Sequence, residues 1–186
     1  MPPKVKISKK QIIDVAVDTV RADGADALNA RTLARRLASS TQPIFSNFAT
    51  MDEVKETVIR EAARINLEHT KSIAESCDYP PYKSSGMAYI RFAREERELF
   101  KLLYMRDRNG EVDTDFGDYE YVIDIIMSSV GLDRERAAMF HFEMWAFVHG
   151  IATMIATSYL SIDDDVASKM LTDAYMGLKL RYTGKE

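Results

Sequence analysis

Apolar residues recur at intervals of three and four along most of the chain, the spacing that gathers side chains on one face of an α-helix. The chain shows no β-hairpin signal and no internal repeat. We therefore predict an all-α protein of about nine helices. These helices span about 8–23, 29–37, 41–47, 50–76, 84–94, 96–106, 117–130, 133–159 and 163–182.

Capping signals support several of these boundaries. Ser8 followed by Gln11, and Thr50 followed by Glu53, have the spacing of capping boxes, which satisfy backbone amides at a helix start. Gly24 follows the first helix, where a residue able to adopt a left-handed conformation commonly ends one. Further caps and stop signals are Asn29, Gly131 and Asp133.

The short helix over 41–47 is the most informative stretch. It follows a turn of about three residues that begins at Ala38, and Ser40 can cap it. We assign Ile44, Phe45 and Phe48 to its inner face. A helix, a tight turn and a short second helix predict a helix-turn-helix, whose second helix enters the major groove of DNA.

In a helix-turn-helix, the N-terminal end of the second helix reaches the base edges. Thr41 and Gln42 hold this position, and Ser46 lies one turn further on. The Gln42 amide can pair with an adenine edge, and Phe45 can pack on a thymine methyl or along the sugar-phosphate backbone. A solvated surface is the alternative for each polar residue. The other candidate DNA-binding residues, mostly phosphate contacts, are Lys9, Arg31, Thr32, Ser40, Asn47 and Thr50.

Charge is divided unevenly along a chain whose net charge is −4. Residues 1–50 hold eight lysines and arginines against four aspartates, whereas the other 136 residues hold 17 basic and 25 acidic side chains. A basic N-terminal segment before an acidic remainder indicates that only this segment meets phosphate.

The remainder predicts a helical body rich in methionine and aromatic residues. Such side chains can line a deformable pocket for a small molecule, and they can equally fill a plain core. His149 lies four residues from Trp145 within an apolar run, so it is either a buried, hydrogen-bonded histidine or a polar anchor for a ligand. The candidate pocket residues are Phe92, Phe100, Tyr104, Tyr121, Met144, Trp145, Val148 and His149.

Together these features resemble the TetR (tetracycline-repressor) family of bacterial transcription regulators. The similarity is clearest over residues 8–65, and includes Asn-Ala-Arg-Thr-Leu-Ala at 29–34 and Ser-Thr-Gln-Pro-Ile-Phe-Ser-Asn-Phe at 40–48. Trp-Ala-Phe-Val-His-Gly at 145–150 is similar to a pattern in the ligand domains of some members. The chain departs from the family pattern at Ala38, Phe45 and Met51, where the family commonly has Gly, Tyr and Lys.

The resemblance implies a DNA-binding domain over residues 1–50, a linking helix over about 50–76, and an effector-binding and dimerisation domain over 77–186. It implies a homodimer formed through the last two helices and bound to a palindromic double-stranded DNA operator. It also implies a repressor that a small-molecule effector releases, because the effector favours a conformation that changes the spacing of the two heads.

Two other functions stay open as alternatives. A TetR-like adaptor or sensor without specific DNA binding is one, because the common Tyr and Lys are missing at Phe45 and Met51. A small helical metalloenzyme would need ligands such as His141, Glu143 and His149, yet Glu143 points away from His141 on a helix. No His-Glu-x-x-His or phosphate-loop motif occurs. We expect no catalytic residue, no metal and no cofactor.

Composition bears on the core, on disulfide bonds and on the cellular location of the protein. Apolar residues make up 46% of the 186 residues, enough for a sizeable core. Cys77 is the single cysteine, so no internal disulfide can form. No apolar run approaches the ~18–20 residues of a membrane span, and the N-terminal residues lack the apolar run of a signal peptide. We therefore expect a cytoplasmic protein with no membrane partner.

Overall fold

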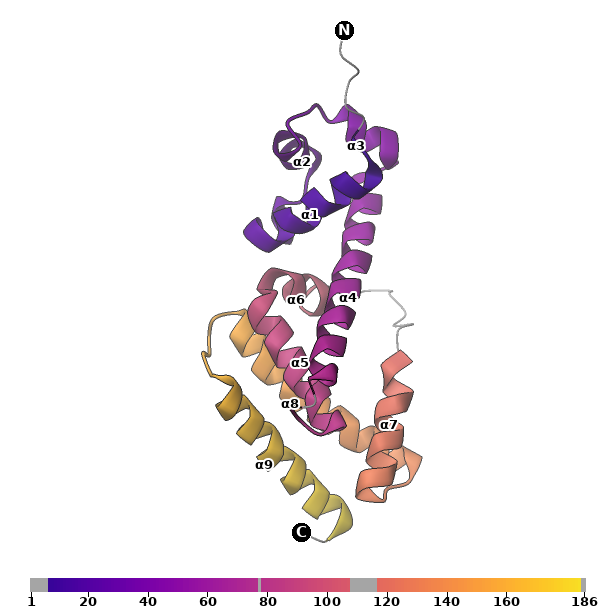
Figure 1. The fold of residues 1–186 in the computed structure, drawn as a ribbon, viewed down its shortest axis with the longest axis vertical. Coiled ribbons are helices and arrows are strands. Elements are labelled where there is room, and N and C mark those ends of the chain that lie inside the picture. Colours follow the sequence, from indigo (N-terminus) through magenta and orange to yellow (C-terminus); the bar gives the residue numbers. More distant parts are fainter. Residues whose placement is uncertain (1–6, 77, 108–116, 185–186) are drawn as a thin grey trace. The chain divides into compact units, whose positions relative to one another are not determined.

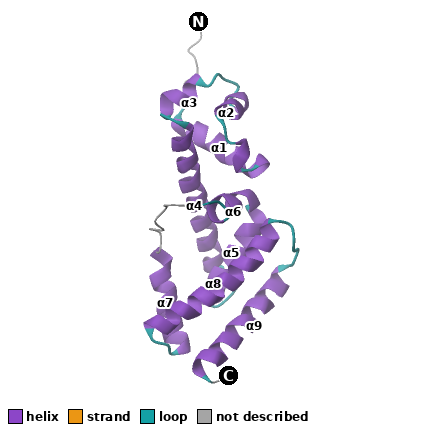
Figure 2. Cartoon of the chain, turned by 180° about the vertical axis from the view of Figure 1, so that it is seen from behind, coloured by secondary structure: helices purple, strands orange, loops and turns teal. Residues whose placement is uncertain are grey.

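The computed structural model describes residues 7–76, 78–107 and 117–184 (Figure 1). Its regular elements are all helical, and Figure 2 shows only helices and loops among the described residues. The predicted all-α class is confirmed. The single cysteine, Cys77, lies outside the described residues. The helices are α1 Lys9–Asp23, η1 Ala25–Ala27 (a 3-10 helix), α2 Ala30–Arg36, α3 Gln42–Asn47, α4 Met51–Glu75, α5 Pro81–Glu95, α6 Arg97–Tyr104, α7 Gly117–Val130, α8 Arg134–Ala156 and α9 Asp164–Thr183.

Contacts divide the chain into two compact units, and the first consists of residues 1–67 and 96–106. It holds α1, α2, α3, α6 and most of α4, and Figure 1 shows α1 to α3 grouped about the N-terminal part of α4. The apolar side chains of α1 are buried along one face. The buried side chains of this unit include Ile12, Ile13, Ala16, Val17, Val20, Leu33, Ala34, Ile44, Phe48, Val54, Val58, Ala62, Leu99 and Phe100.

The capping box of α1 forms as its spacing predicts. The Ser8 hydroxyl accepts from the Gln11 amide at 3.2 Å, and the Gln11 side chain accepts from the Ser8 amide at 2.9 Å. Gly24 ends the helix with φ +82° and ψ 172°, a region that is accessible essentially to glycine alone. Local sequence therefore sets both ends of α1.

At the start of α4, the capping box differs from the standard one in one of its two hydrogen bonds. The Thr50 hydroxyl accepts from the Glu53 amide at 3.1 Å, as expected. The Glu53 carboxylate, however, accepts from the amide of Ala49 at 2.7 Å. The reciprocal bond thus reaches one residue further back than a standard capping box does.

Alanine adopts a left-handed conformation in the turn between α2 and α3. Ala38 has φ +46°, and the next amide, that of Ser39, donates to the Ala34 carbonyl at 2.9 Å. This pairing caps the C-terminal end of α2 in the way that glycine commonly does. The turn forms without glycine, at the steric cost that a Cβ atom imposes in this region.

Helix α3 differs from the expectation in two respects. It begins at Gln42 rather than Thr41, and Thr41 stands at the N-cap without a side-chain bond. The Ser40 hydroxyl accepts from the Gln42 amide at 3.4 Å. The assignment of Phe45 to the inner face is wrong, because its side chain is 49% exposed whereas Ile44 and Phe48 are buried. A six-residue helix has one buried face, and two large side chains fill it.

Three further differences have local causes. Helix α5 begins at Pro81 rather than at about residue 84, because proline suits the first helical position. Helix α8 ends at Ala156, since Ser158 adopts a left-handed φ of +59°. The 3-10 helix η1 is too short for periodicity to reveal.

The second unit consists of residues 68–95 and 107–186. Helices α5, α8 and α9 pack side by side, and α7 packs on α8 and α5 (Figure 1). Arg91 and Arg94 of α5 each donate to the Asp164 carboxylate at 2.6 Å, which fastens the first turn of α9 to α5. The core of this unit contains Met87, Ile90, Val122, Ile123, Ile126, Ala137, Phe140, Met144, Val148, Ile151, Ile155, Ala167 and Leu171.

The expected domain division at residues 50 and 77 stays a prediction. The compact units group residues 96–106 with the N-terminal helices, whereas the sequence suggested that they belong to the body. None of the helices among the described residues is long and apolar enough to cross a membrane.

Candidate nucleic-acid interface

The outward face of α3 carries three exposed side chains, those of Gln42, Phe45 and Ser46. They lie three and four residues apart and therefore share one side of the helix. The buried Ile44 and Phe48 hold the opposite side against the unit. The Ser46 hydroxyl donates to the Gln42 carbonyl at 2.8 Å, so it already has an intrahelical partner. Gln42 and Phe45 are the other two exposed side chains of this face.

Asn47 is engaged within the protein. Its side-chain Nδ2 donates to the Pro43 carbonyl at 2.8 Å and to the Ile7 carbonyl at 3.4 Å. Because Ile7 precedes α1, this amide joins the last turn of α3 to the segment that leads into α1. Asn47 therefore positions α3, a role that the sequence alone did not indicate.

Helix α2 presents basic side chains at the surface. Arg31 and Arg35 are exposed, whereas Arg36 forms an ion pair of 2.6 Å with Asp23. The amide of Thr32 donates to the side chain of the N-cap residue Asn29 at 3.0 Å. The first turn of α2 is thus capped internally, and Arg31 is its exposed cation.

Lys9 also has a partner within the protein. Its ammonium Nζ lies 3.2 Å from Oε1 of Glu53 and 4.4 Å from the centroid of the Phe48 ring. Hydrogen bonding from the Ala49 amide and from Lys9 lowers the pKa of the Glu53 carboxyl, so the carboxylate is ionised at neutral pH. Thr50 caps α4 through its hydroxyl, and the residue is exposed.

The candidate effector residues are distributed over both units. Phe100 and Tyr104 lie on α6 in the first unit, where the Tyr104 hydroxyl accepts from Asn66 at 2.8 Å. In the second unit, Phe92, Met144 and Val148 are buried, whereas Tyr121 is 62% and Trp145 is 42% exposed. The three buried residues fit the interpretation as core.

Two histidines of α8 pair with tyrosines of α5. Nδ1 of His149 lies 2.9 Å from the Tyr89 hydroxyl, and Nδ1 of His141 lies 3.2 Å from the Tyr82 hydroxyl. Burial lowers the pKa of both imidazoles and raises the pKa of the Tyr82 hydroxyl well above its usual value. Burial thus favours the neutral imidazole, and each histidine shares one hydrogen bond with a tyrosine hydroxyl. Sequence reasoning missed both tyrosines, because helical periodicity does not show which helices pair.

The three residues considered as metal ligands each contact a different partner. Glu143 accepts from Arg181 of α9 at 3.2 Å, while His141 and His149 meet different tyrosines. No group of three His, Cys, Asp or Glu side chains suited to a metal occurs among residues 7–76, 78–107 and 117–184.

Solved structures that share the fold of this chain include the following three. A TetR-like transcriptional regulator from Rhodococcus sp. RHA1 has a TM-score of 0.69 and 15% identity, with all of both chains covered. A protein of unknown function from the same organism has a TM-score of 0.75 and 20% identity, covering 96% of this chain and 100% of that one. A variant of TetR from Acinetobacter baumannii AYE, in complex with minocycline, has a TM-score of 0.63 and 18% identity, covering 97% and 100%.

The sequence match lies in the helical body of the chain. Residues 83–174 match the family described as tetracyclin repressor-like, C-terminal domain. The chain belongs to the TetR family. No curated protein sequence matches it. The helix-turn-helix of this TetR-family protein lies outside the matched residues, and its fold is that of the TetR-like structures.

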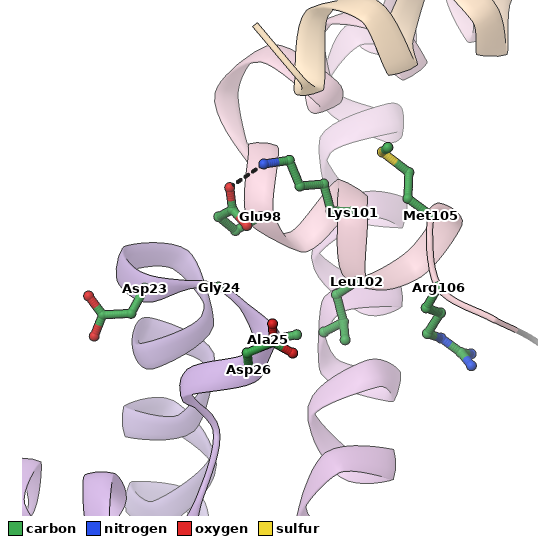
Figure 3. Close-up of a pocket in the computed structure, with 9 residues that line it drawn as sticks. All are labelled: Asp23, Gly24, Ala25, Asp26, Glu98, Lys101, Leu102, Met105 and Arg106. Atoms are coloured by element: carbon green, nitrogen blue, oxygen red, sulfur yellow. Dashed lines mark hydrogen bonds and ion pairs between the residues drawn. The ribbon is translucent and has the colours of Figure 1, made fainter.

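Two shallow hollows lie in the first unit of this TetR-family chain. One, of about 390 Å³, lies between the α1–η1 turn and α6, and its lining includes Asp26, Glu98 and Lys101 (Figure 3). The Glu98 carboxylate and the Lys101 ammonium pair at 2.7 Å in its wall. The other, of about 450 Å³, lies between α1 and α4 and is lined by Lys9, Lys10, Ile13, Asp14, Thr57, Glu61 and Arg64. Neither is lined by a candidate effector residue or an aromatic side chain, so neither supports the expected pocket.

Proposed function

We propose that this TetR-family protein is a transcriptional repressor that binds a palindromic operator as a homodimer and is released by a small molecule. The main observation that supports DNA binding is the exposed outward face of α3. Gln42 and Phe45 stand exposed there, on a helix whose other face is fully packed. An exposed amide beside an exposed aromatic ring offers one group for an adenine edge and one for a thymine methyl, so A·T pairs are the expected core of each half-site.

Exposed apolar side chains on α8 and α9 support the homodimer. Soluble monomers seldom expose many large apolar residues on two neighbouring helices, and such surfaces are typical of interfaces. A two-fold pairing of α8 and α9 would bury them in a bundle of four helices. These residues are Met139, Phe142, Trp145, Phe147, Val166, Met176 and Leu180, with exposed fractions of 39–59%.

Polar pairs inside the second unit support an effector. Tyr89 with His149, and Tyr82 with His141, place hydrogen-bonding groups among apolar side chains. Small-molecule sites combine apolar walls with a few such groups. We propose that a ligand with an apolar surface and one polar group engages the Tyr89–His149 pair and favours a conformation with low DNA affinity.

Selection of bound DNA from a random duplex pool, at a stated salt concentration, tests the proposal. The expected product is an inverted repeat with A·T pairs in each half-site, the half-sites lying about one helical turn or a multiple apart. Enrichment of a single half-site would contradict the dimer. Absence of any enrichment would contradict operator binding and favour an adaptor with the same fold.

A further inference from the structure

The Glu53 carboxylate at the start of α4 is held on two sides. One oxygen, Oε2, accepts from the Ala49 amide at 2.7 Å, and the other, Oε1, lies 3.2 Å from Nζ of Lys9. The Lys9 ammonium also lies over the Phe48 ring. The carboxylate is therefore a fixed acceptor with a bound cation, in contrast to the partner of Lys10, which is Asp14 on the same helix.

We propose that Glu53 is an intramolecular competitor of DNA phosphate for Lys9. This inference rests on the proposed operator binding. A phosphodiester oxygen and a carboxylate oxygen are both anionic acceptors for an ammonium group. In the free protein the Glu53 carboxylate pairs with the Lys9 ammonium. When the protein binds DNA, a backbone phosphate takes the place of the carboxylate in this pair. The carboxylate stays beside the phosphate because the Ala49 amide still holds it, so its charge opposes binding.

The exposure of the pair makes this exchange feasible. The Lys9 and Glu53 side chains are 52% and 37% exposed, so water screens their attraction and the pair separates readily. A highly charged DNA backbone is a stronger attractor for the same cation. Glu53 therefore lowers the affinity for every DNA sequence alike, because a phosphate contact carries no sequence information.

The substitution Glu53→Gln separates charge from structure. A glutamine oxygen can still accept from the Ala49 amide, as in a capping box with Gln, while the negative charge is removed. Glu56→Gln is the matched control, because it removes the same charge from an exposed position one turn further along α4. Both variants should unfold at nearly the wild-type denaturant concentration.

Affinity for the selected operator, measured over a series of salt concentrations, gives the readout. Glu53→Gln should bind about threefold more tightly per head, and therefore about tenfold more tightly as a dimer. Its salt dependence should steepen by about one unit of slope per head, because each Lys9 then neutralises a phosphate without an opposing carboxylate. Glu56→Gln should gain less than half as much.

A double variant tests whether the effect of Glu53 on DNA affinity depends on Lys9. In a Lys9→Gln protein, the added Glu53→Gln change should give at most half of its gain in affinity. An unchanged affinity for Glu53→Gln, a gain equal to that of Glu56→Gln, or the full gain without Lys9 would each overturn the inference. If the wild-type protein binds no duplex even at low salt, operator binding itself fails; if it binds an operator and Glu53→Gln gains nothing, only the role of Glu53 fails.

Discussion

The Arg21 guanidinium of α1 donates two hydrogen bonds, of 2.9 Å and 2.7 Å, to the Glu96 carboxylate at the start of α6. The two residues are 75 positions apart in the chain. The hydrogen bond to Glu96 raises the pKa of the Arg21 guanidinium, although partial burial opposes the shift. Beside this pair, a Cβ atom at Gly24 would lie only 3.2 Å from the Glu98 carboxylate. Helix α6 is thereby fastened to the C-terminal end of α1.

Glu96→Gln should loosen this attachment. A two-bond arginine–carboxylate pair is stronger than an ordinary surface ion pair, so we expect a loss of about 1 kcal/mol in the free energy of unfolding. Urea unfolding followed by circular dichroism measures it. Asp18→Asn is the control, because Asp18 lies 3.5 Å from Arg21 and is more exposed; an equal loss in both variants would contradict a special role for Glu96.

Ala38→Gly should stabilise the protein. Glycine removes the steric cost of the left-handed φ of +46° in the turn before α3, while it adds some entropy to the unfolded chain. We expect a net gain of about 0.5–1 kcal/mol in the free energy of unfolding, measured by the same denaturation. Ala63→Gly, within α4, should have the opposite sign. Destabilisation by both changes would show that Ala38 is unstrained.

Gln42→Ala should relax base preference. The exposed amide can distinguish one base pair by about 1–3 kcal/mol, and alanine cannot. The selected operator should lose preference at one symmetric position, while affinity for unrelated DNA stays nearly constant. Lys9→Ala should instead weaken all sequences alike. Repeating the selection with each variant measures this, and identical behaviour of the two variants would contradict the division into base and backbone contacts.

Acid should destabilise the second unit. Burial lowers the pKa of His141 and of His149, so the unfolded chain binds protons at a pH where the folded protein does not. The free energy of unfolding should therefore fall as the pH decreases below about 6.5, the ordinary histidine value. Urea unfolding between pH 7.5 and about 5 measures the slope. A variant with both histidines changed to Gln should show a shallower slope, and an equal slope would contradict this origin.

Met176→Glu should weaken the proposed dimer. This side chain is 44% exposed on α9, and a charge there would remain unpaired in an apolar interface. Sedimentation equilibrium should show a dimer for the wild type and mostly monomer for the variant at micromolar concentration. Tyr159→Glu is the control, because Tyr159 is 83% exposed and follows the end of α8. A wild-type monomer, or a variant dimer, would contradict the interface.

Local features of this fold were predictable because they depend on nearby residues. The capping box at Ser8 and Gln11, the stop at Gly24 and the cap at Asn29 all form as expected. Boundaries failed where the signal was short, as at the start of α3, or where proline begins a helix, as at Pro81. The exposure of Phe45 was missed because six residues give too little periodicity to separate a buried ring from a surface one.

The pairing of side chains was not predictable from spacing. Lys9 and Asn47 were expected to meet phosphate, yet Lys9 contacts Glu53 and Asn47 reaches the carbonyl of Ile7, which precedes α1. Both partners are acceptors that approach only when α1, α3 and α4 are packed. Whether DNA displaces them stays a prediction.

The sequence by itself determined the all-α class, the succession of the α-helices among the described residues and the helix-turn-helix with its outward Gln42, because helix periodicity and caps act within a few residues. Only the tertiary structure decided that α6 packs on α1 through Arg21 and Glu96, and that the histidines of α8 meet tyrosines of α5. Such contacts depend on which helices share a core. That choice depends on the free energy of packing whole apolar faces, and no local pattern encodes it.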